Sequence, residues 1–224
     1  MPSESKFLIL TPHSVLKNLE EPYLYDIESD ELYELNADAY QFLFQICRGE
    51  NPPIREEDEE FIQFCLSENL VAFSGTSLHR KVTLNPSPIP SLRYLELQIT
   101  DRCNLQCRHC YIGEGSRQDL SMEQIQRVLE EFEEIQGLRL LLSGGEPLLH
   151  PHFWEINDIL RNHAFRSVLL SNGTLITKEV VKKLHVHEVQ ISLDGMKEGH
   201  ESLRGKGTFE KSGMAITHLQ EANI

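Results

Sequence analysis

The sequence predicts an α/β protein in two parts, a small α+β domain followed by a parallel sheet with helices. Two observations carry this prediction. From residue 94 onward, short apolar segments alternate with amphipathic helical segments, which is typical of βαβ units. Before residue 76 that rhythm is absent, and a segment with three prolines, residues 76–93, separates the two parts as a linker.

Residues 1–75 are expected to form a winged-helix-like α+β domain. Strand-like segments cover 6–10, 14–19, 22–27, 31–35 and 70–73, with a polar hairpin turn between the third and the fourth. Asn36 should cap a helix that stops at Gly49, and a second helix is expected over 55–68.

Residues 94–224 are expected to form the parallel sheet. The predicted strands are 94–100, 138–144, 167–173 and 188–195, and the predicted helices are 121–135, 153–162, 178–185 and 208–221. Apolar strands that alternate with amphipathic helices predict parallel pairing with helical crossovers.

Composition excludes several classes of function. The formal net charge of −14 repels nucleic-acid phosphates and anionic lipid, so neither nucleic acid nor a membrane is an expected partner. No apolar stretch approaches the roughly 20 residues that cross a bilayer, and the N-terminus lacks the pattern of a secretory signal. The sequence therefore predicts a cytoplasmic protein.

Three of the five cysteines fall within eight positions, as Cys103, Cys107 and Cys110. Three thiolates on one loop suit an iron–sulfur cubane that keeps one iron open for a small molecule. A structural zinc site usually needs four ligands in paired units, and the second pair is missing. A cluster is therefore favoured over zinc, whereas Cys47 and Cys65 lie in apolar helical contexts typical of core packing.

Three further motifs follow the remaining predicted strands. They are Ser143–Pro147 (SGGEP), Ser171–Thr174 (SNGT) and Ser192–Gly195 (SLDG). In the last, strand alternation should point Ser192 and Asp194 to the same side. Each motif alone is also a plausible turn, but all lie at the carboxyl ends of successive parallel strands, where α/β proteins build their sites.

These motifs together resemble the radical S-adenosylmethionine (SAM) superfamily. The resemblance covers residues 94–221 and rests on C-x3-C-x2-C, Gly-Gly-Glu-Pro and Ser-x-Asp-Gly. The downstream HESLRGKGTFEKS resembles the peptide-maturing branch that carries a C-terminal auxiliary-cluster (SPASM) domain. The resemblance implies a partial (β/α) barrel with a [4Fe–4S] cluster and SAM as cofactors.

The resemblance also implies roles for single residues. The three cysteines would hold three irons, and SAM would chelate the fourth. The expected SAM contacts are Gly144, Gly145 and Glu146 for the amino group, Ser192 and Asp194 for the ribose, Arg204 for the carboxylate, and Asn172 nearby. Such enzymes cleave SAM to a 5′-deoxyadenosyl radical, so a reductant such as flavodoxin or ferredoxin is an expected partner.

The N-terminal domain resembles the RiPP recognition element, in which a precursor leader peptide adds a strand to a sheet edge. The segment ENPPIREED departs from that module, because its middle helix is shortened. The expected substrate is a ribosomal peptide with a leader, although a structural cap on the barrel would explain the same domain.

The predicted core supplies four β/α units where the family usually has six, so we expect a fragment of a longer protein or a truncated gene product. The competing hypothesis is therefore a non-catalytic, leader-peptide-binding fragment.

Overall fold

The computed structural model describes residues 7–78, 85–113 and 118–224. The chain divides into two compact units. The first comprises the residues up to Arg93 together with Glu134–Leu138, and the second comprises Tyr94–Glu133 and Arg139–Ile224. Lys6 at the start of the first predicted strand, and residues 79–84 of the predicted linker, lie outside the described residues.

The first unit contains two small antiparallel sheets. Strands β2 (Ser14–Asn18), β3 (Pro22–Asp26) and β4 (Glu31–Glu34) follow one another as a meander, which confirms the predicted hairpin between β3 and β4. Strand β1 (Phe7–Leu10) pairs with β5 (Val71–Ser74), which closes the unit.

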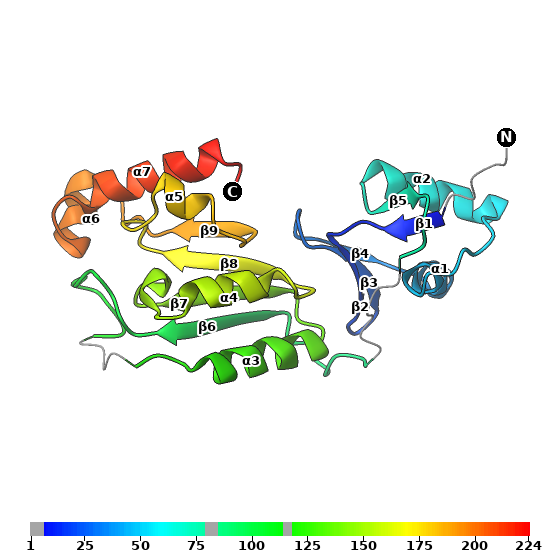
Figure 1. Cartoon of the computed structure of the whole chain (residues 1–224), viewed down its shortest axis with the longest axis horizontal. Helices are drawn as coiled ribbons and strands as arrows, with labels where there is room; N and C mark the ends of the chain where they lie inside the picture. Colours follow the sequence, from blue (N-terminus) through cyan, green and yellow to red (C-terminus); the bar gives the residue numbers. More distant parts are fainter. Residues whose placement is uncertain (1–6, 79–84, 114–117) are drawn as a thin grey trace. The chain divides into compact units, whose positions relative to one another are not determined.

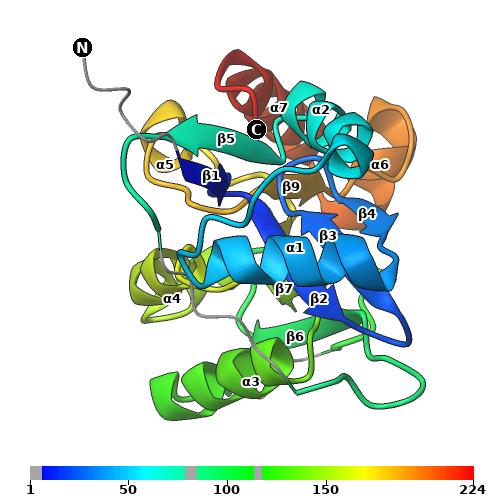
Figure 2. The same ribbon diagram turned by 90° about the vertical axis from the view of Figure 1, so that its right-hand side faces the viewer.

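Two helices pack on these sheets. Helix α1 (Ala37–Cys47) is capped by Asn36, whose side chain accepts from the Ala39 amide at 2.8 Å. Gly49, with a φ of 75°, follows the helix end, as the sequence predicts. The second predicted helix divides into a 3₁₀ turn η1 (Glu56–Asp58) and helix α2 (Glu59–Ser67). Figure 2 shows α1 lying over β2 and β3, which it also contacts.

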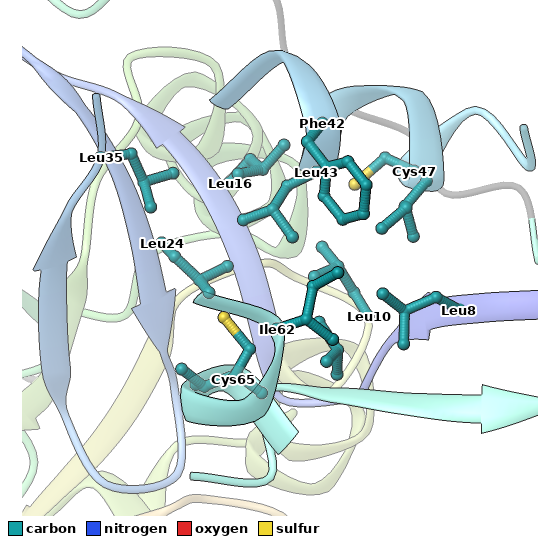
Figure 3. Close-up of a cluster of buried hydrophobic side chains, with 13 residues drawn as sticks. Leu8, Leu10, Leu16, Leu24, Leu35, Phe42, Leu43, Cys47, Ile62 and Cys65 are labelled. Carbon is teal, nitrogen blue, oxygen red and sulfur yellow. The ribbon is translucent and has the colours of Figure 1, made fainter. Parts of the chain in front are cut away.

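The core of the first unit lies between α1, α2 and the strands, as Figure 3 shows. Cys47 and Cys65 belong to it and are 3% and 1% exposed, which confirms their predicted role in packing. Burial raises the pKa of the Cys65 thiol to about 12. The buried members are Leu8, Leu10, Leu16, Leu24, Leu35, Phe42, Leu43, Ile46, Cys47, Ile62, Cys65, Leu70 and Val71.

The described part of the predicted linker is bonded to the end of β2 and to the turn that follows it. The Ser87 amide donates to the Asn18 carbonyl at 2.9 Å. Ser91 and Arg93 both donate to the carboxylate of Glu20. Residues 85–93 are therefore attached to the first unit.

The second unit is a four-stranded, all-parallel sheet in the order β6–β7–β8–β9, as Figure 1 shows. Every strand therefore ends at the same edge of the sheet. The strands are β6 (Tyr94–Thr100), β7 (Arg139–Gly144), β8 (Arg166–Ser171) and β9 (Glu188–Ile191). The helices are α3 (Met122–Glu134), η2 (Pro147–Leu149), α4 (Phe153–Leu160), α5 (Lys178–Val181), α6 (Lys197–Arg204) and α7 (Thr208–Glu221).

The elements of this unit match the predicted order, with three differences. Strand β9 ends at Ile191, so Ser192 and Asp194 lie beyond it in a loop, and the expectation that they alternate along a strand is wrong. Helix α5 is shorter than predicted. Helix α6 was not predicted, because its polar residues and the glycine that follows it hide any apolar periodicity.

Helix α3, the first crossover helix of this unit, begins with a reciprocal pair of side-chain hydrogen bonds. Ser121 and Gln124 bond reciprocally before α3, since each side chain accepts from the other's backbone amide. The buried face of α3 consists of Ile125, Leu129 and Phe132. In the part of the chain that the structure describes, no helix is both long and apolar enough to cross a membrane.

Candidate cofactor site

The four sequence motifs meet at the carboxyl edge of the parallel sheet. The cysteine loop follows β6, the Gly-Gly-Glu-Pro turn follows β7, and the Ser-Asn-Gly loop follows β8. The Ser-Leu-Asp-Gly loop follows β9 and leads into α6. Because the strands are parallel and adjacent, the register of the sheet places these loops next to one another.

The cysteine loop borders a cavity of about 730 Å³. Cys103, Cys107 and Cys110 all line it, and none of them forms a disulfide. Cys103 and Cys110 are exposed, whereas Cys107 is half-buried. The loop is anchored to α6, because the Arg108 amide donates to the Leu203 carbonyl at 2.8 Å.

The donor set fits a cubane cluster better than a single ion. Among the described residues, no group of three or more His, Cys, Asp or Glu side chains could hold one metal ion. A cubane cluster requires a wider arrangement of ligands, because each of its thiolates binds a different iron. Three free thiols that border one cavity provide such an arrangement. Burial raises the pKa of Cys103 and Cys107, while the Arg204 guanidinium acts in the opposite direction on Cys107.

Gly144 and Gly145 allow the β7 turn to lie against the start of the cysteine loop. A Cβ on Gly144 would come within 2.5 Å of the Thr100 carbonyl oxygen, and one on Gly145 would overlap the Arg102 carbonyl. The Gly145 amide donates to the Thr100 carbonyl at 2.9 Å. Their missing side chains therefore serve the contact between two backbone segments.

Glu146 is fully buried, at 0% exposure. Its carboxylate accepts from the Ser171 hydroxyl at 2.9 and 3.1 Å and from the Asn172 amide at 2.9 Å. Burial raises the pKa of this carboxyl, and the bonds from Asn172 and Ser171 oppose that shift. Glu146 thus joins the turn after β7 to the loop after β8.

Asn172 connects that loop to the cysteines. Its side-chain nitrogen lies 3.0 Å from Oδ1 of Asn104 and 3.9 Å from Sγ of Cys103. The next residue, Gly173, has a φ of 80° and lies close to Ser212 and Ala215 of α7. A side chain there would be strained and would push against that helix.

Asp194 and Arg204 form an ion pair beside the cysteine loop. The guanidinium donates from Nε and Nη2 to both carboxylate oxygens, and it lowers the pKa of Asp194. Nε2 of His109, the residue before the last cysteine, lies 3.5 Å from the same carboxylate. Ser192 joins this region through its amide, which donates to the Ser171 carbonyl at 3.0 Å.

His200 is a site residue that the sequence reasoning did not single out. It is 0% exposed, and its Nδ1 lies 3.3 Å from the Asp194 amide. Because that amide must donate, Nδ1 accepts and Nε2 carries the proton of the neutral ring. Nε2 has no hydrogen-bond partner within the described ranges. The feature of the sequence that could have identified His200 is its position in the HESLRG segment, four residues before Arg204 on α6.

A family model now accounts for this arrangement. The model described as the radical SAM superfamily matches residues 97–224. The chain belongs to the radical SAM superfamily. The match begins within β6 and covers all four loops of the site.

Two curated relatives are similar to part of this chain. The mycofactocin maturase MftC of Mycolicibacterium smegmatis is 37% identical over an alignment of 136 residues, and the match covers 58% of this chain and 35% of that protein. The antilisterial bacteriocin subtilosin biosynthesis protein AlbA of Bacillus subtilis is 33% identical over an alignment of 157 residues, and the match covers 66% of this chain and 35% of that protein. The alignments thus cover about a third of the length of each relative.

A solved structure resembles nearly the whole chain. Streptococcus suis SuiB bound to S-adenosylmethionine has a TM-score of 0.64 and 15% identity, and the match covers 96% of this chain and 54% of SuiB. At that identity the likeness concerns the fold alone. It confirms the α/β fold class with a partial barrel, and its coverage extends to the first unit.

Proposed function

We propose that this protein is a radical SAM enzyme that modifies a peptide. The observation that carries the proposal is the set of three free cysteines around one cavity, at the sheet edge where the Gly-Gly-Glu-Pro turn also ends. When bound, a [4Fe–4S] cluster at Cys103, Cys107 and Cys110 supplies the electron that splits SAM and leaves a radical able to abstract hydrogen. The remaining residues would orient SAM there.

The SAM contacts belong to this proposal. Gly144 and Gly145 bring the turn after β7 next to the cysteine loop, so their backbone atoms border the proposed amino-group position. Glu146 would stabilise that ammonium group as a buried anion. Arg204 would pair with the SAM carboxylate, and Asp194 would accept from the ribose hydroxyls. These two contacts require either that the ion pair between Arg204 and Asp194 opens, or that both residues keep it while they also bind SAM.

Ser192 and Asn172 complete the proposed set. Ser192 lies one residue beyond the end of β9, on the loop that carries Asp194, which suits a ribose contact. The side chain of Asn172 lies next to Cys103, so we expect it to lie near the cluster. The electron is proposed to come from a small carrier such as flavodoxin or ferredoxin. A reducing cytoplasm suits this chemistry, because it keeps the cluster-binding cysteines as free thiols.

The proposed substrate is a ribosomal peptide. Support comes from the names of the relatives, which include a mycofactocin maturase and a bacteriocin biosynthesis protein. A second structure of SuiB was solved bound to precursor peptide SuiA. For this chain, the leader of such a peptide is proposed to bind residues 1–75, with 76–93 as the connection to the core at 94–224.

The edge of β4 is the proposed place for the leader. Among the described residues, β4 pairs with β3 alone, so its outer edge is open to strand addition. Tyr33 of β4 and Phe64 of α2 meet beside that edge with ring centroids 5.6 Å apart. Phe64 is 41% exposed, which leaves an aromatic surface for a peptide side chain.

The cluster is tested by anaerobic reconstitution with iron and sulfide. The chain should become brown and show the charge-transfer absorption of a [4Fe–4S] cluster. Cys107→Ala should lose this absorption, whereas Cys47→Ala and Cys65→Ala should retain it, because those two residues lie in the core of the first unit. A variant without all three loop cysteines that still assembled the cluster would falsify the proposal.

A further inference from the structure

We propose that Asn172 is a positioning residue for the cluster, which donates a hydrogen bond to the sulfur of Cys103 and raises the reduction potential. This inference rests on the proposed function, because it concerns the cluster at the three loop cysteines. It gives the Asn172 side chain a direct contact with the cluster, beside the proposed SAM contacts.

The orientation of the carboxamide is fixed by a neighbour that can only donate. The backbone amide of Thr174 lies 2.9 Å from one side-chain atom of Asn172, and that atom must therefore be the oxygen. The Thr174 hydroxyl also donates to it, at 2.6 Å. The nitrogen consequently faces the other way, toward Asn104 and Cys103.

The backbone of Asn172 is held equally firmly. Its amide donates to the buried carboxylate of Glu146 at 2.9 Å, and its carbonyl accepts from the Ser212 hydroxyl on α7 at 2.8 Å. The residue is 6% exposed. The loop after β8 therefore presents its side-chain nitrogen from a fixed backbone, and Glu146 sets that position from the turn after β7.

The two hydrogens of the nitrogen have separate acceptors on the cysteine loop. One points to Oδ1 of Asn104 at 3.0 Å, and the other to Sγ of Cys103 at 3.9 Å. The sulfur distance is long for a thiol, but an iron-bound thiolate is a stronger acceptor because it carries negative charge. Asn104 also donates to the Thr174 hydroxyl at 2.7 Å, which keeps the loop next to Asn172.

A donor at a cluster sulfur changes the redox equilibrium in a defined direction. Reduction adds negative charge to the cluster and its thiolates, so an N–H group that points at a sulfur stabilises the reduced state more than the oxidised state. Removing the donor should make reduction less favourable by about tenfold, which is about 59 mV for a one-electron couple.

The test is an EPR-monitored redox titration of the reconstituted chain, with dithionite as reductant. Asn172→Asp keeps the oxygen that accepts from Thr174 and removes the donor, while Asn172→Ala removes the donor without adding a charge. Both should shift the potential to more negative values. Thr217→Val on α7 is the control, because it removes an exposed hydroxyl that contacts only the Gly213 carbonyl and leaves the contacts of Asn172 in place, and its reduction equilibrium should stay within about twofold of the wild type.

A second measurement observes the contact itself. Pulsed EPR of the reduced wild-type protein, labelled with ¹⁵N in the asparagine carboxamides, should show a coupling that Asn104→Asp retains and Asn172→Asp loses. A wild-type spectrum without that coupling overturns the inference, even if the variants take up no cluster. Unshifted potentials in both Asn172 variants overturn it too, as does a shift confined to Asn172→Asp. If the wild type assembles no cluster, the proposed function itself fails.

Discussion

Glu146 has a structural role at this site in addition to its proposed role in binding SAM. A carboxylate at 0% exposure is stable only when hydrogen bonds replace its lost water, and here Ser171 and Asn172 provide them. His200 has a similar relation to the Asp194 loop, since its ring accepts from a backbone amide. These residues shape the loops that the proposed cofactors would contact.

Glu146→Gln is therefore expected to destabilise the fold. The carboxamide replaces one acceptor oxygen with an NH2 donor and removes the negative charge, so the bonds from the Ser171 hydroxyl and the Asn172 amide are no longer charge-assisted. We expect the free energy of unfolding to fall by about 1–3 kcal/mol, as measured by denaturant titration. The exposed Glu123→Gln on α3 is the control and should leave stability unchanged.

The same variant also tests the proposed SAM contact. Replacing an anion with a neutral amide should weaken SAM binding roughly ten- to a hundredfold in the reconstituted protein, because a hydrogen bond to a charged group is worth about 1.5–3 kcal/mol. Unchanged SAM affinity, by calorimetry, would contradict the contact and leave Glu146 with the structural role alone.

At the scale of elements, the site depends on backbone segments that approach one another closely. The turn after β7 lies against the strand end and loop that lead to Cys103. Helix α6 holds the same loop from another direction, through the bond from Arg108 to Leu203. The positions of the three cysteines thus depend on contacts with residues outside their own loop.

Gly145→Ala should disturb the cysteine loop without touching a cysteine. Its Cβ would overlap the carbonyl of Arg102, and all of the nearest atoms are backbone atoms of Asp101 and Arg102, which leaves little room for adjustment. We expect a loss of about 1–3 kcal/mol in stability and a lower yield of reconstituted cluster per chain. Gly213→Ala on α7, where a Cβ meets nothing within 4 Å, is the control. Full cluster yield in Gly145→Ala would show that this close approach is not required.

The attachment of residues 85–93 to the first unit should depend on pH. The bonds from Ser91 and Arg93 hold the pKa of Glu20 at about 2, below its ordinary value of 4.5. A depressed carboxyl pKa stabilises the folded contact above pH 4.5, and this contribution is lost as the pH falls from 4.5 toward 2. The protection factor of the Ser91 amide, which is its exchange rate relative to an unstructured peptide at the same pH, should fall across that window and should already be low in Glu20→Gln at pH 6. Slow exchange in that variant would mean that other contacts hold the segment.

For the whole molecule, we propose that the first unit binds the leader and that the second unit carries out the radical chemistry. The full chain should bind a leader peptide encoded beside its gene, and hydrogen exchange should then slow at the β4 amides, because an added strand gives them partners. A scrambled peptide serves as the control ligand. Absence of binding at high micromolar concentration would instead favour a structural cap.

Phe64→Ala tests the aromatic surface next to that edge. Because Phe64 packs against Tyr33 beside β4, its removal should weaken peptide binding by about tenfold. Phe73→Ala is the matched control, since Phe73 is also exposed, at 51%, but lies on β5 in the other sheet. Equal effects of the two substitutions would contradict a leader site at β4.

Local patterns in the amino-acid chain were enough to predict the order of the strands, the helices other than α6, and the position of the four motifs at the carboxyl ends of the strands. Those features depend on local patterns, such as the Asn36 cap, the alternation of apolar segments and the cysteine spacing. Tertiary structure alone decided that Glu146 is buried under Ser171 and Asn172, that Gly145 accommodates Arg102, and that His200 supports Asp194. The first two contacts form because adjacent parallel strands bring together loops that are distant in the chain, as Glu146 and Asn172 are at a separation of 26 residues, and no local pattern records which atoms then meet. The third joins residues only six apart, but it depends on helix α6, which the local pattern did not predict.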